Sequence, residues 1–275
     1  MLSAENLTAL TIGFYLAASA LGLGGIMRRK GSWRTAGCWL ALTAFCCQTI
    51  ILIFGFHRLM PAGLSAGAYL QLLAWFSLLC GIGAWLRMRQ DAILIFSAPF
   101  GLLLFLISAA WLHMPIALPK SLTTPFFALH IGALFLGLGL LAVACLGALL
   151  FIILEHRIKA KKIMRGFWED MPALHMLDRI NAVCVTAAFP LYTIGVAAGL
   201  AWARPIFGSI LTGDVKEVVS LLVWALLAVL FYGRLVRGWR GRMPALLTAA
   251  IFAISLFSII FVNLYFSSHH GYIRN

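Results

Sequence analysis

Charged residues are scarce in this sequence. Of its 275 residues, 11% are charged and 63% are hydrophobic, and the mean hydropathy is +1.00. Soluble domains carry about 25% charged residues, so the composition excludes a soluble domain and predicts a membrane protein. Only 8 residues are acidic against 21 basic ones. The basic residues lie in short connections between apolar runs, where they indicate topology and contacts with lipid headgroups, and we expect no nucleic-acid partner.

The sequence also shows no cysteine framework, and we expect no cleavable leader. None of the six cysteines forms a CxxC pair, and all lie in or beside apolar runs. This pattern favours small packing residues over disulfides or a thiol redox site. The N-terminus MLSAENLTAL lacks the basic start and cleavage site of a signal peptide, so we expect its apolar run to be retained as the first helix.

Eight apolar runs are long enough to cross a bilayer, which takes about 20 residues each. The sequence therefore predicts an all-α polytopic transmembrane bundle of about eight helices, with residues 1–275 forming one transmembrane domain. The predicted spans are residues 7–27, 35–56, 68–86, 93–111, 126–154, 180–203, 218–235 and 246–267.

Lysine and arginine are distributed unevenly between alternate connections of these spans. Sixteen of the 21 fall in the first, third, fifth and seventh connections, and five fall in the others or near the C-terminus. Cytoplasmic loops carry an excess of basic residues, so we expect the first set to be cytoplasmic and both termini to be extracytoplasmic. The longest basic connection, within residues 155–179, mixes cations with Phe167 and Trp168. It is typical of a helix in the membrane interface, and docking of a cytosolic partner is the alternative.

Small residues recur at helical spacing inside the spans. Gly195 and Gly199 form a GxxxG spacing, and Ala133 and Gly137 form its looser counterpart. Such spacings let helices approach closely. Charged groups are nearly absent from the spans, which argues against a proton-coupled transporter.

Histidines gather on the predicted extracytoplasmic side, where five of the seven lie: His57, His113, His130, His269 and His270. His130 follows about one turn into the fifth span, where an imidazole needs a carbonyl, a water or a metal as its partner. His269 and His270 follow the eighth span, and only one of two adjacent helical positions faces the bundle. Either would meet His130 if the fifth and eighth helices are neighbours.

Two imidazoles facing each other across an apolar pocket are typical ligands of haem iron. Zinc is less suitable, because it needs three or four ligands and no Cys or carboxylate cluster is placed to help. The alternative is that these histidines are core or interfacial residues without a metal. Asp214 and Glu217 have a comparable alternative, as capping groups at the start of the seventh span.

The segment FGSILTGDVKEVVSLLVWALLAVLFYGRLVRGWRGR and the terminal HHGY carry a family resemblance. The stretch from His130 to the C-terminus resembles the CcsA/HemX-like family of cytochrome c assembly membrane proteins, which is related more distantly to CcmC. The resemblance implies haem b held by His130 and His270 as axial ligands, with Tyr272, Asp214 and Trp224 beside it. His57, His113 and His269 are weaker iron-ligand candidates. No catalytic residue is implied.

The chain departs from the family pattern at one loop. Where haem-presenting members have Trp-Gly-x-x-Trp-x-Trp-Asp, this chain has Phe207 to Asp214 with all three tryptophans missing. This departure favours haem handling over full synthetase activity.

From the resemblance we expect a multi-pass protein of a bacterial inner membrane that handles or delivers haem, with residues 126–275 as the haem-handling half. A second cytochrome c assembly subunit is a possible partner, besides haem and the lipid bilayer. Two alternatives remain. One is a HemX-like regulator or scaffold whose connection at residues 155–179 docks a cytosolic haem-biosynthetic enzyme, the glutamyl-tRNA reductase. The other is a haem transporter.

Overall fold

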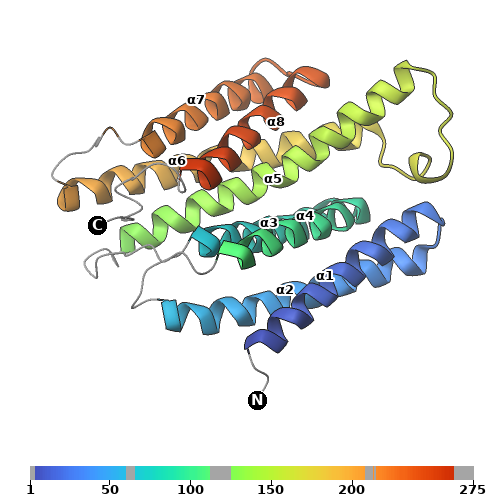
Figure 1. Cartoon of the computed structure of the whole chain (residues 1–275). Helices are drawn as coiled ribbons and strands as arrows, with labels where there is room; N and C mark the ends of the chain where they lie inside the picture. The colour runs from blue at the N-terminus through green and yellow to red at the C-terminus, as the bar shows by residue number, and fades with distance from the viewer. Residues whose placement is uncertain (1–3, 60–65, 112–124, 208–212, 214, 263–275) are drawn as a thin grey trace.

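A computed structural model of the chain describes residues 4–59, 66–111, 125–207, 213 and 215–262, and within these ranges every regular element is helical (Figure 1). Eight helices are long and apolar enough to cross a membrane, as the sequence predicts. The elements are α1 (Ala4–Met27), α2 (Gly31–Leu59), α3 (Ala66–Met88), α4 (Asp91–Trp111), α5 (Pro125–Lys159), η2 (Gly166–Trp168), α6 (Leu174–Phe207), α7 (Val215–Leu235), α8 (Arg242–Phe257) and η3 (Ser258–Val262).

The helices pack in layers (Figure 1). One apolar core joins α1 and α2 to α3 and α4 around the fully buried Tyr15. A larger core joins α3 and α4 to α5–α8, so α3 and α4 form a layer that both cores share. Large apolar side chains also cover the outside: Trp39 and Phe54 are 63% and 68% exposed. Such exposure suits a chain whose solvent is lipid.

Close backbone approaches hold the layers together. A Cβ added at Gly37 of α2 would lie 2.7 Å from the backbone nitrogen of Gly22 in α1, and one at Gly139 of α5 would lie 2.7 Å from the carbonyl oxygen of Phe76 in α3. In soluble proteins, water supplies a hydrophobic driving force that brings helices together. Lipid supplies no such force, so membrane helices depend on close contact between their backbones. All six cysteines are free, and four of them are buried in this packing, as expected.

A buried polar link also crosses the first layers. The hydroxyl of Tyr15 in α1 donates to the side-chain oxygen of Gln48 in α2, and the Gln48 amide donates to the backbone oxygen of Gln71 in α3, at 3.1 Å. Both glutamines are almost fully buried. A polar group in lipid must find its partner inside the protein, so these bonds fix how α1, α2 and α3 are oriented about their axes.

The four basic connections lie together at one end of the bundle, and α1, α3, α5 and α7 begin at the other (Figure 1). This arrangement agrees with the predicted sorting of connections. Which end faces the cytoplasm stays a prediction. Arg29 and Arg34, around the α1–α2 turn, form ion pairs with Glu169 and Asp170, which follow η2. The α5–α6 connection is thereby attached to the first layer.

The expected interfacial helix in residues 155–179 is wrong in extent. Helix α5 continues to Lys159 and α6 already begins at Leu174, so only the three-residue turn η2 lies between them. Gly166, which starts this turn, has a positive φ of 61° that favours glycine and ends any longer helix. Trp168 of η2 packs under Arg157, whose guanidinium carbon lies 3.9 Å from the ring centroid.

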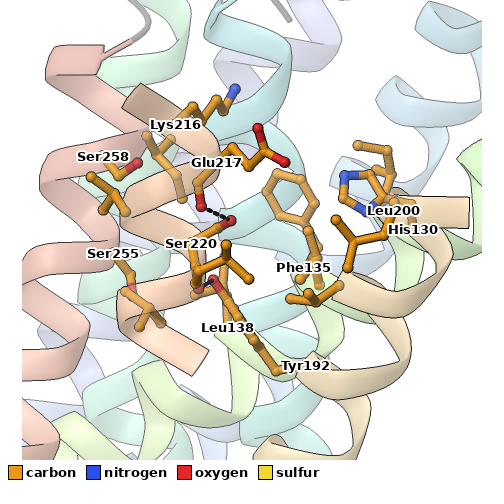
Figure 2. Close-up of a pocket in the computed structure, with 18 of the residues that line it drawn as sticks. His130, Phe135, Leu138, Tyr192, Leu200, Lys216, Glu217, Ser220, Ser255 and Ser258 are labelled. Carbon is orange, nitrogen blue, oxygen red and sulfur yellow. Dashed lines mark hydrogen bonds between the residues drawn. The ribbon is translucent and has the colours of Figure 1, made fainter. Parts of the chain in front are cut away.

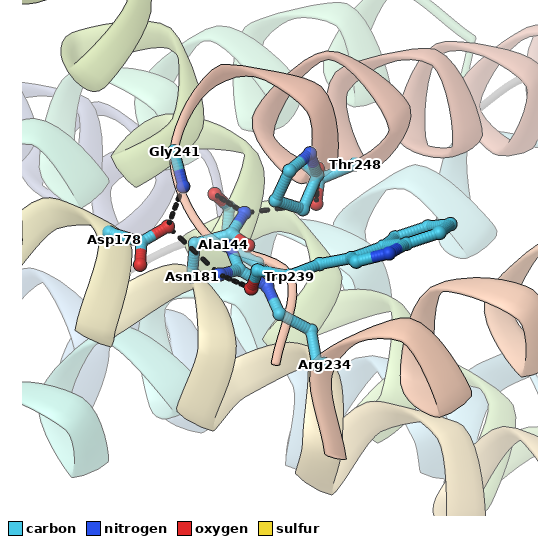
Figure 3. Close-up of polar contacts among 8 residues, drawn as sticks. Ala144, Asp178, Asn181, Arg234, Trp239, Gly241 and Thr248 are labelled. Carbon is cyan, nitrogen blue, oxygen red and sulfur yellow. Dashed lines mark hydrogen bonds and ion pairs between the residues drawn. The ribbon is translucent and has the colours of Figure 1, made fainter. Parts of the chain in front are cut away.

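Arg234 forms a buried ion pair at the basic end (Figure 3). Its side chain is 2% exposed, and its guanidinium donates to Asp178 of α6 at 2.8 Å, to the carbonyl oxygen of Trp239 at 2.9 Å and to the side-chain oxygen of Asn181. Asp178 also accepts the backbone N–H of Gly241 at 3.0 Å. Arg234 is one of the 16 basic residues that the sequence predicts to lie in connections, whereas its side chain lies inside the bundle.

Asn181 extends this network to two further helices. Its amide donates to the carbonyl oxygen of Ala144 in α5 at 3.0 Å and to the hydroxyl of Thr248 in α8 at 2.9 Å. Asn181 and Thr248 are 1% and 0% exposed. One network therefore joins α5, α6, α7 and α8 at the basic end of the bundle.

We predict that Arg234→Met lowers the free energy of unfolding by about 3–5 kcal/mol, because it leaves the Asp178 carboxylate buried without its cation. Equilibrium unfolding by SDS in mixed micelles measures this change. Lys159→Gln is the matched control: it removes a cation from an ion pair whose lysine is 64% exposed, and should cost below about 1 kcal/mol. The double variant Arg234→Met/Asp178→Leu should recover part of the loss. Equal effects of the two single variants would contradict the structural role of the pair.

Candidate functional site

A cavity of about 150 Å³ lies between α3, α5, α6, α7 and the α8–η3 junction (Figure 2). It lies toward the end at which α5 and α7 begin, opposite the basic connections. Its walls are mainly apolar, with a few polar groups: His130, Tyr69, Tyr192, Lys216, Glu217, Ser220, Ser255 and Ser258. An apolar pocket with a few convergent polar groups is the usual form of a ligand site.

His130 lies on α5 in the cavity wall. Its Nδ1 is 2.7 Å from the carbonyl oxygen of Gly195 in α6. A carbonyl oxygen only accepts hydrogen bonds, so Nδ1 carries the proton and Nε2 carries the lone pair of the neutral ring. Histidines that bind metals are held in this way, with one ring nitrogen donating to a carbonyl and the other bound to the metal.

Two glycines of α6 make room for side chains of α5. A Cβ added at Gly199 would lie 2.5 Å from Nδ1 and 2.6 Å from Cε1 of His130, and one at Gly195 would lie 2.7 Å from Cγ of Leu134. The GxxxG spacing therefore has two effects. It lets α6 approach a neighbouring helix, as predicted, and that neighbour is α5. It also leaves the place that the histidine ring takes.

Aromatic rings from α3 and α5 form one wall. Tyr69 and Phe135 stack with ring centroids 6.1 Å apart and an interplanar angle of 16°, and Phe76 continues the stack at 6.2 Å from Phe135. Offset stacks of this kind are favourable and present flat apolar surfaces. Tyr69 and Phe135 line the cavity, so it has a flat aromatic boundary.

The first turn of α7 forms the rim. Lys216 and Glu217 both line the cavity and are half-buried. The Nζ of Lys216 lies 5.0 Å from the ring centroid of Tyr69. Oε2 of Glu217 accepts the backbone N–H of Gly213 at 3.1 Å, so the predicted capping contribution of Glu217 is present.

The end of α8 closes the cavity on its remaining side. Ser255 of α8 and Ser258 and Ile259 of the π-helical turn η3 line it together with residues of α5. Helices α5 and α8 are therefore neighbours, which is the arrangement that the paired-histidine prediction requires. Single π-helical turns are frequent at functional sites.

The comparison with known families gives a match over residues 65–270, to the cytochrome C assembly proteins. The matched range begins just before α3 and includes every described residue that lines the cavity. The chain belongs to the cytochrome C assembly protein family.

The relatives of this cytochrome C assembly protein are named cytochrome c biogenesis protein CcsA. The CcsA of Guillardia theta is 26% identical over 292 aligned residues, which cover 98% of this chain and 95% of that protein. The CcsA of Chlamydomonas reinhardtii is 30% identical over 156 residues, covering 56% and 42%. That of Trichodesmium erythraeum is 36% identical over 104 residues, covering 38% and 30%. The matches thus span less than half of the last two relatives.

Within this family member, the structure describes some of the predicted site residues and not others. His130 lines the cavity. Trp224 of α7 does not: its indole N–H donates to the hydroxyl of Thr193 at 3.1 Å, and its ring stacks on Phe189. His57 belongs to α2, which contributes no described lining residue, and its side chain is not described. The remaining candidates lie outside the described residues: His113, Asp214, His269, His270 and Tyr272.

Three lining residues are not among the site residues that the sequence predicts: Tyr69, Phe135 and Lys216. No local pattern singles out Tyr69, which lies far along the chain from His130 and reaches the cavity only because α3 packs beside α5. Lys216 did have a signal, since it is a cation in the first turn of a helix on the side with few cations.

We predict that Gly199→Ala destabilises the fold by about 1–3 kcal/mol, because the added methyl would overlap the His130 ring. Unfolding by SDS in mixed micelles measures it. Gly132→Ala on α5 is the matched control, since a Cβ there meets nothing within 4 Å. That control should be neutral or stabilising by up to about 1 kcal/mol. If Gly199→Ala were as stable as the control, the His130 ring would not be tightly packed against α6.

Proposed function

We propose that this protein handles haem during cytochrome c assembly, holding it at the cavity with His130 as one axial ligand. The observation that carries the proposal is the hydrogen bond between His130 Nδ1 and the carbonyl oxygen of Gly195, which orients an imidazole in the wall of the cavity in the way that metal-binding histidines are oriented. Family membership supports the same function and favours it over a regulatory scaffold or a transporter. Haem is here the cargo.

The chemistry of the cavity fits such a ligand. Mostly apolar walls and the flat Tyr69–Phe135 stack suit a planar macrocycle, and one imidazole suits its iron. The volume fits only in part. Pockets that enclose drug-sized ligands measure about 300–1,000 Å³, so a cavity of about 150 Å³ would hold one portion of haem. The rest of the haem would lie toward the end of the bundle at which α5 and α7 begin.

His270 is the second axial ligand in this proposal, with Tyr272, Asp214 and Trp224 as further contacts. The supporting observation is that η3, which precedes the terminal HHGY, lines the same cavity as His130. Trp224 would act through α6, because its indole contacts Thr193 and Phe189 beside the cavity. The family resemblance favours His270 over His269. Haem b is the form we propose, and a second assembly subunit is the proposed recipient or partner.

We expect His130→Ala to lose or shift the Soret band of the purified full-length protein, because the iron would lose a strong-field nitrogen ligand. His270→Ala should shift the band in the same direction. The measurement is the absorption spectrum of oxidised and reduced protein purified from cells supplied with haem.

His156→Ala and His175→Ala are the matched controls for these variants. Both histidines are exposed and lie at the basic end, on the same two helices that form the seat of His130. Their removal should leave the spectrum unchanged. An unchanged band in both His130→Ala and His270→Ala would exclude the axial-ligand assignment.

The orientation is also a proposal: the basic end faces the cytoplasm of a bacterium, and the cavity opens toward the extracytoplasmic face of its inner membrane. Alkaline phosphatase, which is active only outside the cytoplasm, tests it as a fusion partner. We predict low activity for a fusion after residue 238, in the α7–α8 connection, and high activity for a fusion after residue 275. The reverse pattern would invert the orientation.

A further inference from the structure

Lys216 and His130 lie on different walls of the cavity. Among the described residues that line it, Lys216 is the only lysine or arginine. It lies on α7, whereas His130 lies on α5, and Figure 2 shows the two side chains on different sides of the apolar interior. A ligand that reaches both groups must have a large apolar body between two different polar ends.

The ammonium group of Lys216 is positioned by its surroundings. The side chain is half-buried, and Nζ lies 5.0 Å from the ring centroid of Tyr69, which is 6% exposed. A cation over an aromatic face is attracted by the ring. Tyr69 in turn stacks on Phe135, so the cation is held at the edge of the aromatic wall.

Glu217 is the acidic group of the same rim. Its carboxylate accepts the N–H of Gly213 at 3.1 Å and lies at the start of α7, where the helix dipole stabilises negative charge. The carboxylate is therefore stabilised at the first turn of α7, next to Lys216 at the rim of the cavity.

We infer that Lys216 is a carboxylate-binding residue of this cavity, and that the ligand must present an acid group to α7 while its body contacts His130 and the aromatic wall. This inference rests on the proposed function, in which the acid is a propionate of haem. Lysine binds carboxylates through short, charge-assisted hydrogen bonds. Lys216 would thus fix which edge of the macrocycle faces the bundle end, and it would select acids over neutral analogues.

Titration of the full-length protein in nanodiscs with haem and with haem dimethyl ester tests the inference. The ester keeps the iron and macrocycle and lacks both carboxylates. We expect Lys216→Gln to weaken haem binding about five- to tenfold and to leave the affinity for the ester unchanged. Lys216→Arg should restore most of the preference, since it keeps the charge. The Soret position should stay as in the wild type, because His130 is intact.

Lys159→Gln is the matched control: it removes the same charge at the other end of the bundle, and should leave both affinities unchanged. Equal weakening of haem and ester by Lys216→Gln, or no weakening of either, would overturn the carboxylate role. Displacement of haem by laurate, lost in Lys216→Gln, would instead assign the lysine to a lipid acid and overturn the propionate assignment.

Different results of this experiment would contradict the proposed function and the proposed role of Lys216. If the wild type binds neither haem nor its ester, the proposed function is wrong and the role of Lys216 with it. If the wild type binds haem and His130→Ala changes the spectrum while Lys216→Gln leaves the haem-to-ester ratio unchanged, only the role of Lys216 is wrong.

Discussion

The close approach of α5 and α6 is the constraint on which the cavity depends. In lipid, two helices gain little by covering each other's apolar side chains, so backbone proximity and hydrogen bonds must hold them together. Gly195 and Gly199 supply that proximity, and the ring of His130 occupies the place that a side chain at Gly199 would fill. The same contact brings the Gly195 carbonyl to His130 Nδ1. Packing and tautomer are thus set by one pair of glycines.

The other end of these helices is also held together by a buried polar network. The Arg234–Asp178 pair and Asn181 link α6, α7, α5 and α8, and these four helices, with α3, enclose the cavity at the opposite end. Burying an ion pair is costly, and this one is tolerated because further hydrogen bonds surround both charges. A network at one end leaves the opposite end of α5–α8 able to enclose a cavity without losing the relative positions of the helices.

The sequence predicted the parts of this structure that depend on local pattern. Hydropathy predicted the eight spans, and small-residue spacing predicted that helices approach closely, because both signals are contained within one helix. The spacing did not predict that α5 and α6 are the partners. The location of Arg234 could not be predicted, since the end of a span beside a basic connection looks the same whether its arginine turns inward or outward. The placement of Tyr69 in the cavity wall and of Trp224 against α6 depends on which helices are neighbours, and that information is not contained in any single segment.

Lys216 differs from most basic residues of this chain, because it lies at the end of the bundle that has few cations. A lysine at the basic end would only reinforce the topology signal that 16 basic residues already provide. A lysine at the other end opposes that signal, because it adds charge to the side that the proposed orientation places outside the cytoplasm. Sixteen cations outweigh this cost, so topology tolerates Lys216 without explaining it. Lys216 contacts Tyr69 at the rim of a mainly apolar cavity. The carboxylate-binding role that we propose would explain why a cation lies there, since its charge would serve a ligand rather than the membrane topology.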